Sequence, residues 1–388
     1  MARPLRIALV AGEASGDLLG AAFIEALRQR QPDAVFSGVA GPRMVAAGCG
    51  ALAGSEELAV MGFVEPLRHL PRLLRLRSRL LRSFLDDRPD VFVGIDSPSF
   101  NLGLAKRLKR AGIPTVQYVS PQVWAWRQGR VRTIGKSVDL ILCLLPFEAA
   151  FYAAHAVRAE FVGHPLADQM PLQPDRDGAR AELGLPAEVQ VVALLPGSRH
   201  GEVARLGPVF AAAARQLAAS RPAGSLRFIA PMASHEAREQ FQVQVRAAGA
   251  DVQLLEGRSQ LALAAADAVL VTSGTATLET MLSKRPMVVA YKVAPLTAFV
   301  ARDLGVVKVT HCSQPNLLAN EALVPEFLQE AATPDALAAA LAKQLDDDAN
   351  RAHLAARFAD LHQVLRREGA ARAADAVLGL VRDPAAVG

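Results

Sequence analysis

The strongest constraint on the fold is an alternation of short apolar runs with longer helical patterns, which stops near the middle of the chain and starts again. In the first half, the apolar runs predict strands at residues 6–10, 35–39, 91–95, 115–119 and 140–144. After a stretch rich in Pro, Asp and Gln at residues 171–177, they predict strands at residues 191–195, 226–229, 252–255, 268–271 and 287–290. Strands that alternate with helices build parallel sheets covered on both faces. We therefore predict an α/β chain with two Rossmann-like doubly wound domains.

The length of the chain favours the same division, because 388 residues exceed the size at which a single hydrophobic core stops growing. We place the first domain at residues 1–170 and the second at residues 171–388. We expect the final helices to pack either on the first domain or on a partner subunit, which leaves a homodimer open. Two such domains form a cleft at the carboxyl ends of their strands, where ligands of this fold class bind.

Composition excludes several other classes of protein. Cys49, Cys143 and Cys312 are widely spaced and form no C-x-x-C pair, so the sequence indicates neither a disulfide framework nor a zinc site. The chain shows no apolar signal region and no apolar stretch as long as a bilayer is thick, so we expect a cytoplasmic protein. The net charge of +5 suits nucleic acid, anionic membrane or phosphorylated substrates as partners. Nucleic acid is disfavoured because the basic residues are not interleaved with stacking aromatics.

Two loops of small residues predict a binding site for a nucleotide diphosphate. Each loop follows an apolar run and opens a helix; the first contains Gly197, Ser198 and Arg199, and the second contains Ser273, Gly274 and Thr275. Backbone N–H groups at such helix starts bind phosphate, and the Arg199 guanidinium adds a bidentate donor. Glu279 lies one turn after Thr275, where its carboxylate faces the same site and can accept hydrogen bonds from a ribose. For either loop alone, helix capping explains the residues equally well. The sequence contains neither a P-loop motif nor a G-x-G-x-x-G after a strand.

Asp96 directly follows the apolar run at residues 91–95, at the end of a predicted strand. A carboxylate in this position points into the cleft, where a general base deprotonates an incoming hydroxyl. Capping of the next helix is the alternative, but Pro98 intervenes, and Ser99 or Asn101 is better placed for the cap. We therefore favour catalysis.

Two further segments supply candidates for the acceptor side of the cleft. The segment at residues 11–17 follows the first strand and opens a helix; its candidates are Glu13, Ser15, Gly16 and Asp17. Ser15 as a helix N-cap is an equally good interpretation of this segment. The segment at residues 118–127 holds both tryptophans; its candidates are Ser120, Trp124 and Arg127. Core packing would also explain the tryptophans, but their polar neighbours favour a loop that lines the cleft.

A predicted helix at residues 71–85 carries four arginines at spacings of three and four, here called the arginine stripe: Arg72, Arg75, Arg79 and Arg82. Leucines fill most of the remaining positions, and Pro71 suits the first turn. A solvated basic face of an ordinary helix explains this pattern as well as a helix that lies on an anionic membrane surface.

Eight motifs together resemble the lipid-A-disaccharide synthase family, in order and over nearly the full length. They are residues 11–17 (AGEASGD), 38–43 (GVAGPR), 58–62 (LAVMG), 94–98 (GIDSP), 118–127 (YVSPQVWAWR), 195–199 (LPGSR), 273–279 (SGTATLE) and 315–319 (PNLLA). The resemblance implies a glycosyltransferase of the GT-B type that needs no metal ion or other cofactor. It also implies a peripheral protein on the cytoplasmic face of the inner membrane of Gram-negative bacteria.

The reaction that this resemblance implies joins UDP-2,3-diacylglucosamine to 2,3-diacylglucosamine 1-phosphate, with inversion, and releases UDP. The resemblance places the catalytic base on Asp96 and the essential diphosphate-binding arginine on Arg199, and it adds Asn316 to the UDP site. It makes residues 1–170 the acceptor-binding domain with the base, and residues 171–388 the domain that binds the UDP-sugar. Ser99 departs from the family pattern, which commonly has a second Asp there. The alternatives are a UDP-sugar epimerase-like protein and a non-catalytic protein that binds nucleotide sugars.

Overall fold

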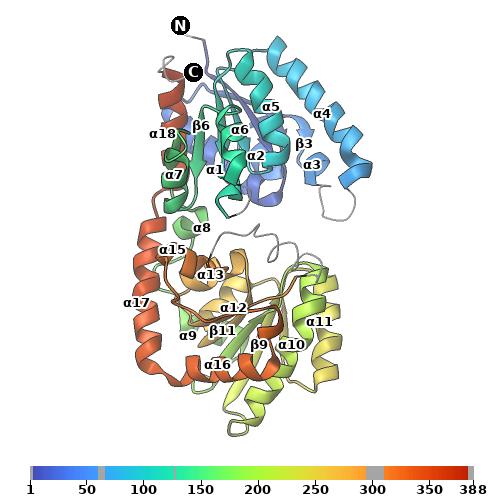
Figure 1. Ribbon diagram of the computed structural model, residues 1–388, viewed down its shortest axis with the longest axis vertical. Coiled ribbons are helices and arrows are strands. Elements are labelled where there is room, and N and C mark those ends of the chain that lie inside the picture. Colours follow the sequence, from blue (N-terminus) through green and yellow to red (C-terminus); the bar gives the residue numbers. More distant parts are fainter. Residues whose placement is uncertain (1–2, 60–65, 126–127, 294–309, 383–388) are drawn as a thin grey trace. The chain divides into compact units, whose positions relative to one another are not determined.

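The computed structural model describes residues 3–59, 66–125, 128–293 and 310–382 (Figure 1). The chain divides into two compact units. The first unit combines Met1–Asp168 with Leu365–Gly388, and the second unit is Gln169–Val364. Each unit contains one sheet whose described strands all run parallel. The prediction of two doubly wound α/β domains is therefore confirmed.

The first unit has a seven-stranded sheet in the order β3-β2-β1-β4-β5-β6-β7. The strands are β1 (Arg6–Ala11), β2 (Val35–Ala40), β3 (Cys49–Gly54), β4 (Val91–Ile95), β5 (Thr115–Tyr118), β6 (Leu140–Cys143) and β7 (Ala159–Phe161). The helices are α1 (Ala14–Arg30), α2 (Pro42–Ala46), α3 (Glu56–Ala59), α4 (Pro66–Asp86), α5 (Pro98–Arg110), η1 (Gln122–Trp124), η2 (Gln128–Arg130), α6 (Val131–Gly135), α7 (Pro146–Ala153), α8 (Pro165–Gln169) and α18 (Gly369–Arg382).

Side chains on both faces of this sheet are buried, which explains why its central strands read as continuous apolar runs. Ile7 and Leu9 of β1 pack in a core with α1 and α18, whereas Ala8 and Val10 pack in a second core with α4 and α5. The last helix, α18, thus covers the first sheet beside α1 (Figure 1). Residues 365–388 belong to the first unit, although they follow the second unit in sequence.

The second unit has a six-stranded sheet in the order β10-β9-β8-β11-β12-β13. The strands are β8 (Gln190–Leu195), β9 (Leu226–Met232), β10 (Gln253–Glu256), β11 (Ala268–Thr272), β12 (Met287–Tyr291) and β13 (Glu326–Leu328). The helices are α9 (Arg176–Leu183), α10 (His200–Ala219), α11 (His235–Ala248), α12 (Ser259–Ala265), α13 (Thr275–Leu282), α15 (Gln314–Ala319), η3 (Gln329–Ala331), α16 (Pro334–Asp346) and α17 (Asp348–Leu365). One face packs against α10, α11 and α16.

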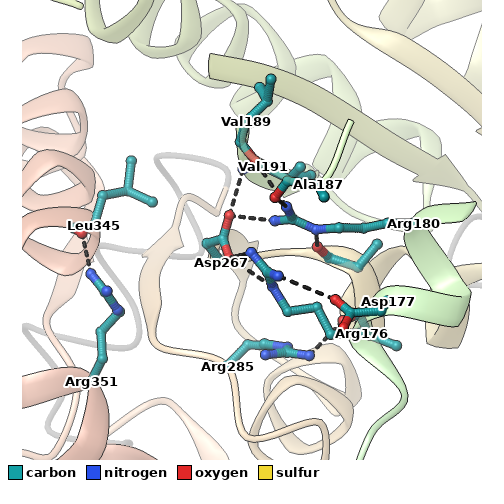
Figure 2. A network of polar contacts seen from close by, with 12 residues as sticks. Arg176, Asp177, Arg180, Ala187, Val189, Val191, Asp267, Arg285, Leu345 and Arg351 are labelled. Carbon is teal, nitrogen blue, oxygen red and sulfur yellow. Dashed lines mark hydrogen bonds and ion pairs between the residues drawn. The ribbon is translucent and has the colours of Figure 1, made fainter. Parts of the chain in front are cut away.

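A buried ion network ties α9 to the amino ends of β8 and β11 (Figure 2). Arg180 is 2% exposed, and its guanidinium pairs with the Asp267 carboxylate and donates to the Ala265 carbonyl at 3.0 Å. Asp267 also accepts from Arg176 at 2.9 Å and from the Val191 amide at 2.8 Å. Burial lowers the pKa of the nearby Arg285 guanidinium to about 10, opposed by Asp267. The network anchors the start of the second unit on its sheet.

The structure corrects several predicted boundaries. The helix predicted at residues 71–85 begins at Pro66, so Pro71 lies inside it and not in its first turn. The helix after Asp96 begins at Pro98, because Pro suits the first helical position, and Ser97 is its N-cap. The strand predicted at residues 115–119 ends at Tyr118. Among the described residues, no helix is long and apolar enough to span a bilayer.

Candidate functional site

The turn after β4 holds Asp96 in an unusual backbone conformation. Asp96 and Ser97 have φ angles of 52° and 41°, and such left-handed conformations cost non-glycine residues about 1–3 kcal/mol each. The main chain of Asp96 is held on both sides: its amide donates to the Tyr118 carbonyl at 2.8 Å. Its carbonyl accepts from Asn101 Nδ2 at 2.8 Å and from Gln117 Nε2 at 2.9 Å. These three bonds use backbone atoms of Asp96 and do not involve its carboxylate, which accepts one hydrogen bond from the Ser97 backbone.

The electrostatics of Asp96 suit a general base. Burial raises the pKa of the Asp96 carboxyl above its usual value, and a hydrogen bond from the Ser97 backbone opposes part of this shift. A carboxylate whose pKa is raised toward neutrality accepts a proton more readily than an ordinary one. Ser99, the departure from the family pattern, is exposed in the first turn of α5.

The loop after β1 lies beside this turn, because β1 and β4 are neighbours and Ala11 pairs with Ile95. A Cβ on Gly12 would lie 2.5 Å from the Ser97 hydroxyl, so a glycine is needed for the two loops to approach this closely. Glu13 and Ser15 are exposed at the start of α1, and Glu13 is the N-cap of this helix without a side-chain capping bond. The alternative in which Ser15 caps this helix is therefore wrong. Gly16 is buried behind them.

The Asp17 carboxylate holds the neighbouring loop in place. Its side chain is 4% exposed, and its two oxygens accept from the Arg43 and Met44 amides at 2.9 and 3.0 Å. These bonds cap the start of α2. A Cβ on Gly41 would lie 2.4 Å from the Asp17 carboxyl carbon, which explains the glycine in that motif. Asp17 thus links the first two motifs of the chain, and its carboxylate points into the protein.

The segment after β5 also turns its predicted site residues inward. Trp124 is 9% exposed, donates from Nε1 to Glu148 Oε1 at 3.0 Å and packs edge-to-face on Phe147. Ser120 is buried against the Tyr152 hydroxyl at 3.4 Å. Ser120 and Trp124 are thus packed within the first unit, as the alternative of core packing predicts. Arg127 and Trp126 lie outside the described residues.

Glu148 is the buried partner of this segment, and no motif in the sequence pointed to it. Burial raises the pKa of its carboxyl to about 7, while hydrogen bonds from the Leu145 amide, Trp124 and Ser120 oppose the shift. The segment after β5 is thus anchored on a carboxyl group that titrates near neutral pH.

In the second unit, two donor groups of the loop after β8 point toward one anion, the Glu202 carboxylate. Ser198 and Arg199 are exposed, and α10 begins directly after them. The Ser198 amide and the Arg199 guanidinium both donate to the Glu202 carboxylate, at 3.1 and 3.0 Å. The arrangement shows that this loop holds a carboxylate with the donors that were predicted to hold a diphosphate.

The loop after β11 leaves the same edge of the sheet, because β8 and β11 are neighbours and Leu195 pairs with Val271. The Ser273 hydroxyl donates to the Cys312 carbonyl at 2.6 Å, so it braces the loop. Gly274 is the N-cap of α13 with a φ of 138°, and Thr275 is exposed beside it. Glu279 is half-buried one turn later, and burial raises the pKa of its carboxyl.

Asn316 holds the backbone near this loop. It is 1% exposed, its Nδ2 donates to the Val324 carbonyl and to Glu326 at 2.9 Å each, and its Oδ1 accepts from the Val324 amide at 2.9 Å. Glu326 also accepts from the Ser313 hydroxyl at 2.6 Å and from the Ser313 and Cys312 amides. Burial raises the pKa of the Glu326 carboxyl, but these hydrogen bonds outweigh it and leave the pKa below its usual value. The Asn316 amide is thus used within the protein.

Tyr291, at the carboxyl end of β12, completes the surroundings of the loop after β8. Burial and the Glu202 carboxylate raise the pKa of its hydroxyl, whereas Arg199 and Arg205 lower it. The residue after Tyr291 contacts α10, because Arg205 Nε donates to the Lys292 carbonyl at 3.1 Å. No motif in the sequence points to Tyr291, because its position in the second unit depends on the order of the strands. Among the described residues, no group of three or more metal-ligating side chains is placed to hold a metal ion.

Solved structures of low sequence identity share the fold of the chain. The glycosyltransferase of kitacinnamycin matches with a TM-score of 0.63 at 18% identity, over 98% of this chain and 100% of that chain. The UDP-GlcNAc 2-epimerase from Neisseria meningitidis, bound to UDP-GlcNAc, also matches with a TM-score of 0.63, at 11% identity, over 98% and 100% of the two chains. Fold alone therefore does not separate transferases from epimerases, although it confirms the predicted GT-B architecture.

Sequence relatives separate them. The family model described as Lipid-A-disaccharide synthetase matches residues 7–377. A lipid-A-disaccharide synthase of Alkalilimnicola ehrlichii is 57% identical over 378 residues, which cover 96% of this chain and 98% of that protein. One of Azotobacter vinelandii is 56% identical over 382 residues, which cover 98% and 99%. The chain belongs to the lipid-A-disaccharide synthase family, as its eight motifs predicted.

Proposed function

We propose that this chain transfers 2,3-diacylglucosamine from UDP to 2,3-diacylglucosamine 1-phosphate, forming the β-1,6-linked tetraacyl disaccharide 1-phosphate and UDP. Family membership supports a glycosyltransferase of lipid A biosynthesis and disfavours the epimerase-like and non-catalytic alternatives. The structural observation that carries the proposal is the loop after β8, where a backbone amide and a guanidinium converge on one anion.

The donor is held through its UDP moiety. In the proposal, Arg199 and the backbone amides of Gly197 and Ser198 bind the diphosphate, and the start of α13 at Gly274 and Thr275 adds further amides. These donors are in place before the reaction, and they stabilise the negative charge that gathers on departing UDP. Glu279 is one turn further along α13 and accepts hydrogen bonds from the ribose hydroxyls.

The acceptor is activated by Asp96. In an inverting transfer, a carboxylate takes the proton of the acceptor 6-hydroxyl as its oxygen attacks the anomeric carbon from the face opposite UDP. No covalent enzyme intermediate is needed, because the new bond forms as the bond to UDP breaks. Glu13 and Ser15 are exposed at the start of α1 and are the proposed contacts of the acceptor sugar.

The chain reaches its acylated substrates at the membrane surface through α4. Leu73, Leu76, Leu80 and Phe84 of α4 are buried in the first unit, so this part of the helix is anchored. The arginine stripe is exposed on α4, and Leu74 beside it is 42% exposed. A groove of about 630 Å³ on this helix is lined by the arginine stripe, Glu57, Leu74, Leu76 and Ser78. Basic and apolar side chains together suit anionic lipid headgroups and the acyl boundary, at the cytoplasmic face of the inner membrane.

Release of UDP tests the proposed function. The purified chain is incubated with the acylated UDP-sugar, with and without 2,3-diacylglucosamine 1-phosphate, and UDP and disaccharide are quantified. A transferase releases UDP in proportion to disaccharide and only when the acceptor is present. Isomerisation of the donor without the acceptor would instead identify an epimerase.

A further inference from the structure

The Glu202 carboxylate accepts hydrogen bonds from N–H groups that the proposed function assigns to the diphosphate. Its Oε2 accepts from the Ser198 amide at 3.1 Å and from the Arg199 amide at 3.4 Å, and its Oε1 accepts from Arg199 Nη1 at 3.0 Å. The Glu202 side chain is 18% exposed, so most of it is packed against the loop. One carboxylate therefore accepts hydrogen bonds from two backbone amides and a guanidinium.

Helix capping accounts for only part of this arrangement. Glu202 is at the third position of α10, where a glutamate commonly accepts from the N-cap amide. That amide belongs to Arg199 and makes the longest of the three contacts, whereas the Ser198 amide and the guanidinium are closer. A Cβ on Gly197 would lie 2.4 Å from the Glu202 Cβ. The glycine in the loop thus makes room for Glu202 as well as for a left-handed turn.

A carboxylate and a diphosphate compete for these donors, because both are anions and each of the two backbone amides has a single N–H to donate. We infer that Glu202 occupies the diphosphate position when no nucleotide is bound, that donor binding displaces it, and that it returns as UDP leaves. The inference rests on the proposed function of the loop after β8, and it gives Glu202 a positioning role in the release of product.

Because a nucleotide diphosphate must displace Glu202 in order to bind, the free energy needed for this displacement weakens its binding. Glu202→Gln removes the negative charge but keeps an amide oxygen that still caps α10. Because exposed ion pairs contribute modestly, we expect the Kd for UDP to fall by about three- to fivefold in this variant. Inhibition by UDP should strengthen by the same factor, and kcat should not rise, because product leaves more slowly.

The test is calorimetric titration of UDP into the full-length parent, Glu202→Gln and the control Glu188→Gln. Glu188 is exposed in the second unit and precedes β8, at the opposite end of the strand. Glu202→Ala, which removes both charge and cap, provides a second variant. The inference predicts tighter UDP binding in both Glu202 variants and parental binding in the control.

Parental or weaker UDP binding by folded Glu202→Gln would overturn the inference and show that Glu202 orients Arg199. Thermal unfolding of each variant verifies that binding is compared between folded chains. Failure of the parent to bind UDP is a different result, because it would overturn the proposed function of the loop itself.

Discussion

Asp96→Asn removes the proposed base and leaves the bonds that hold its turn. The carbonyl of residue 96 accepts from Asn101 and Gln117, and its amide donates to Tyr118, so these three bonds do not depend on the carboxylate. The amide oxygen of Asn can still accept the hydrogen bond from the Ser97 backbone. Asn also adopts the left-handed conformation, which the φ of 52° at this position requires, more readily than most residues. We therefore expect the variant to fold as the parent does and to bind UDP with parental affinity.

The expected loss in turnover is about 10²- to 10⁴-fold, which is the range for a lost general base and equals about 2.7–5.5 kcal/mol in the barrier. Burial raises the pKa of Asp96, and only the ionised form accepts a proton. Parental turnover should therefore fall as the pH drops through this raised pKa. Residual turnover of the variant should lack that acidic limb, which a pH profile of UDP release measures.

Stability separates this chemical role from a structural one. A carboxyl group whose pKa is raised by folding stabilises the protein at low pH, and this contribution is lost as the pH rises through the folded-state pKa. The ionised Asp96 therefore lowers the free energy of unfolding at neutral pH. Asp96→Asn should melt at the parental temperature or above. A clear fall in melting temperature, or turnover within a few fold of the parent, would refute the assignment of the base.

Variants of Arg199, of the arginine stripe and of Glu148 test three other parts of the structure. Arg199→Ala should weaken UDP binding by about 1.5–3 kcal/mol in calorimetry, as expected for a lost charge-assisted contact; parental affinity would place the nucleotide elsewhere. Serine at all four positions of the arginine stripe should reduce sedimentation with anionic vesicles and leave neutral vesicles unaffected, and parental binding should weaken with salt. Unchanged binding would make α4 an ordinary packing helix. Because folding raises the pKa of Glu148 to about 7, its contribution to stability should be lost between pH 4.5 and about 7, and Glu148→Gln should abolish this part of the pH dependence of unfolding; an unchanged pH dependence would show that Glu148 does not titrate there.

The sequence predicted the two sheets well because their strands are buried on both faces and read as apolar runs. It missed β3, β7 and β13, which are short or lie toward the edges of the sheets, where burial is less continuous. The place of α18 on the first sheet was left open, because the return of a chain to an earlier unit leaves no local pattern.

The candidate site was predicted at the level of loops and less well at the level of side chains. Asp96 and the loop at Arg199 end strands as expected, because carboxyl ends of neighbouring parallel strands meet at one edge. Asp17, Trp124 and Asn316 lie in other motifs of the same family but bond within the protein, and a motif does not distinguish a ligand contact from an internal bond. Glu202 escaped notice because its capping position looks ordinary until the loop that it contacts is seen.

The most direct test of the proposed transfer is the configuration of its product. The chain is given the α-linked acylated UDP-sugar together with 2,3-diacylglucosamine 1-phosphate, and the anomeric coupling of the new disaccharide is measured by NMR while UDP is quantified. The proposed transfer gives a β-1,6 linkage and one UDP for each disaccharide, and Asp96→Asn should slow the formation of both by about 10²- to 10⁴-fold. An α-linked product, or release of UDP without any acceptor, would contradict it.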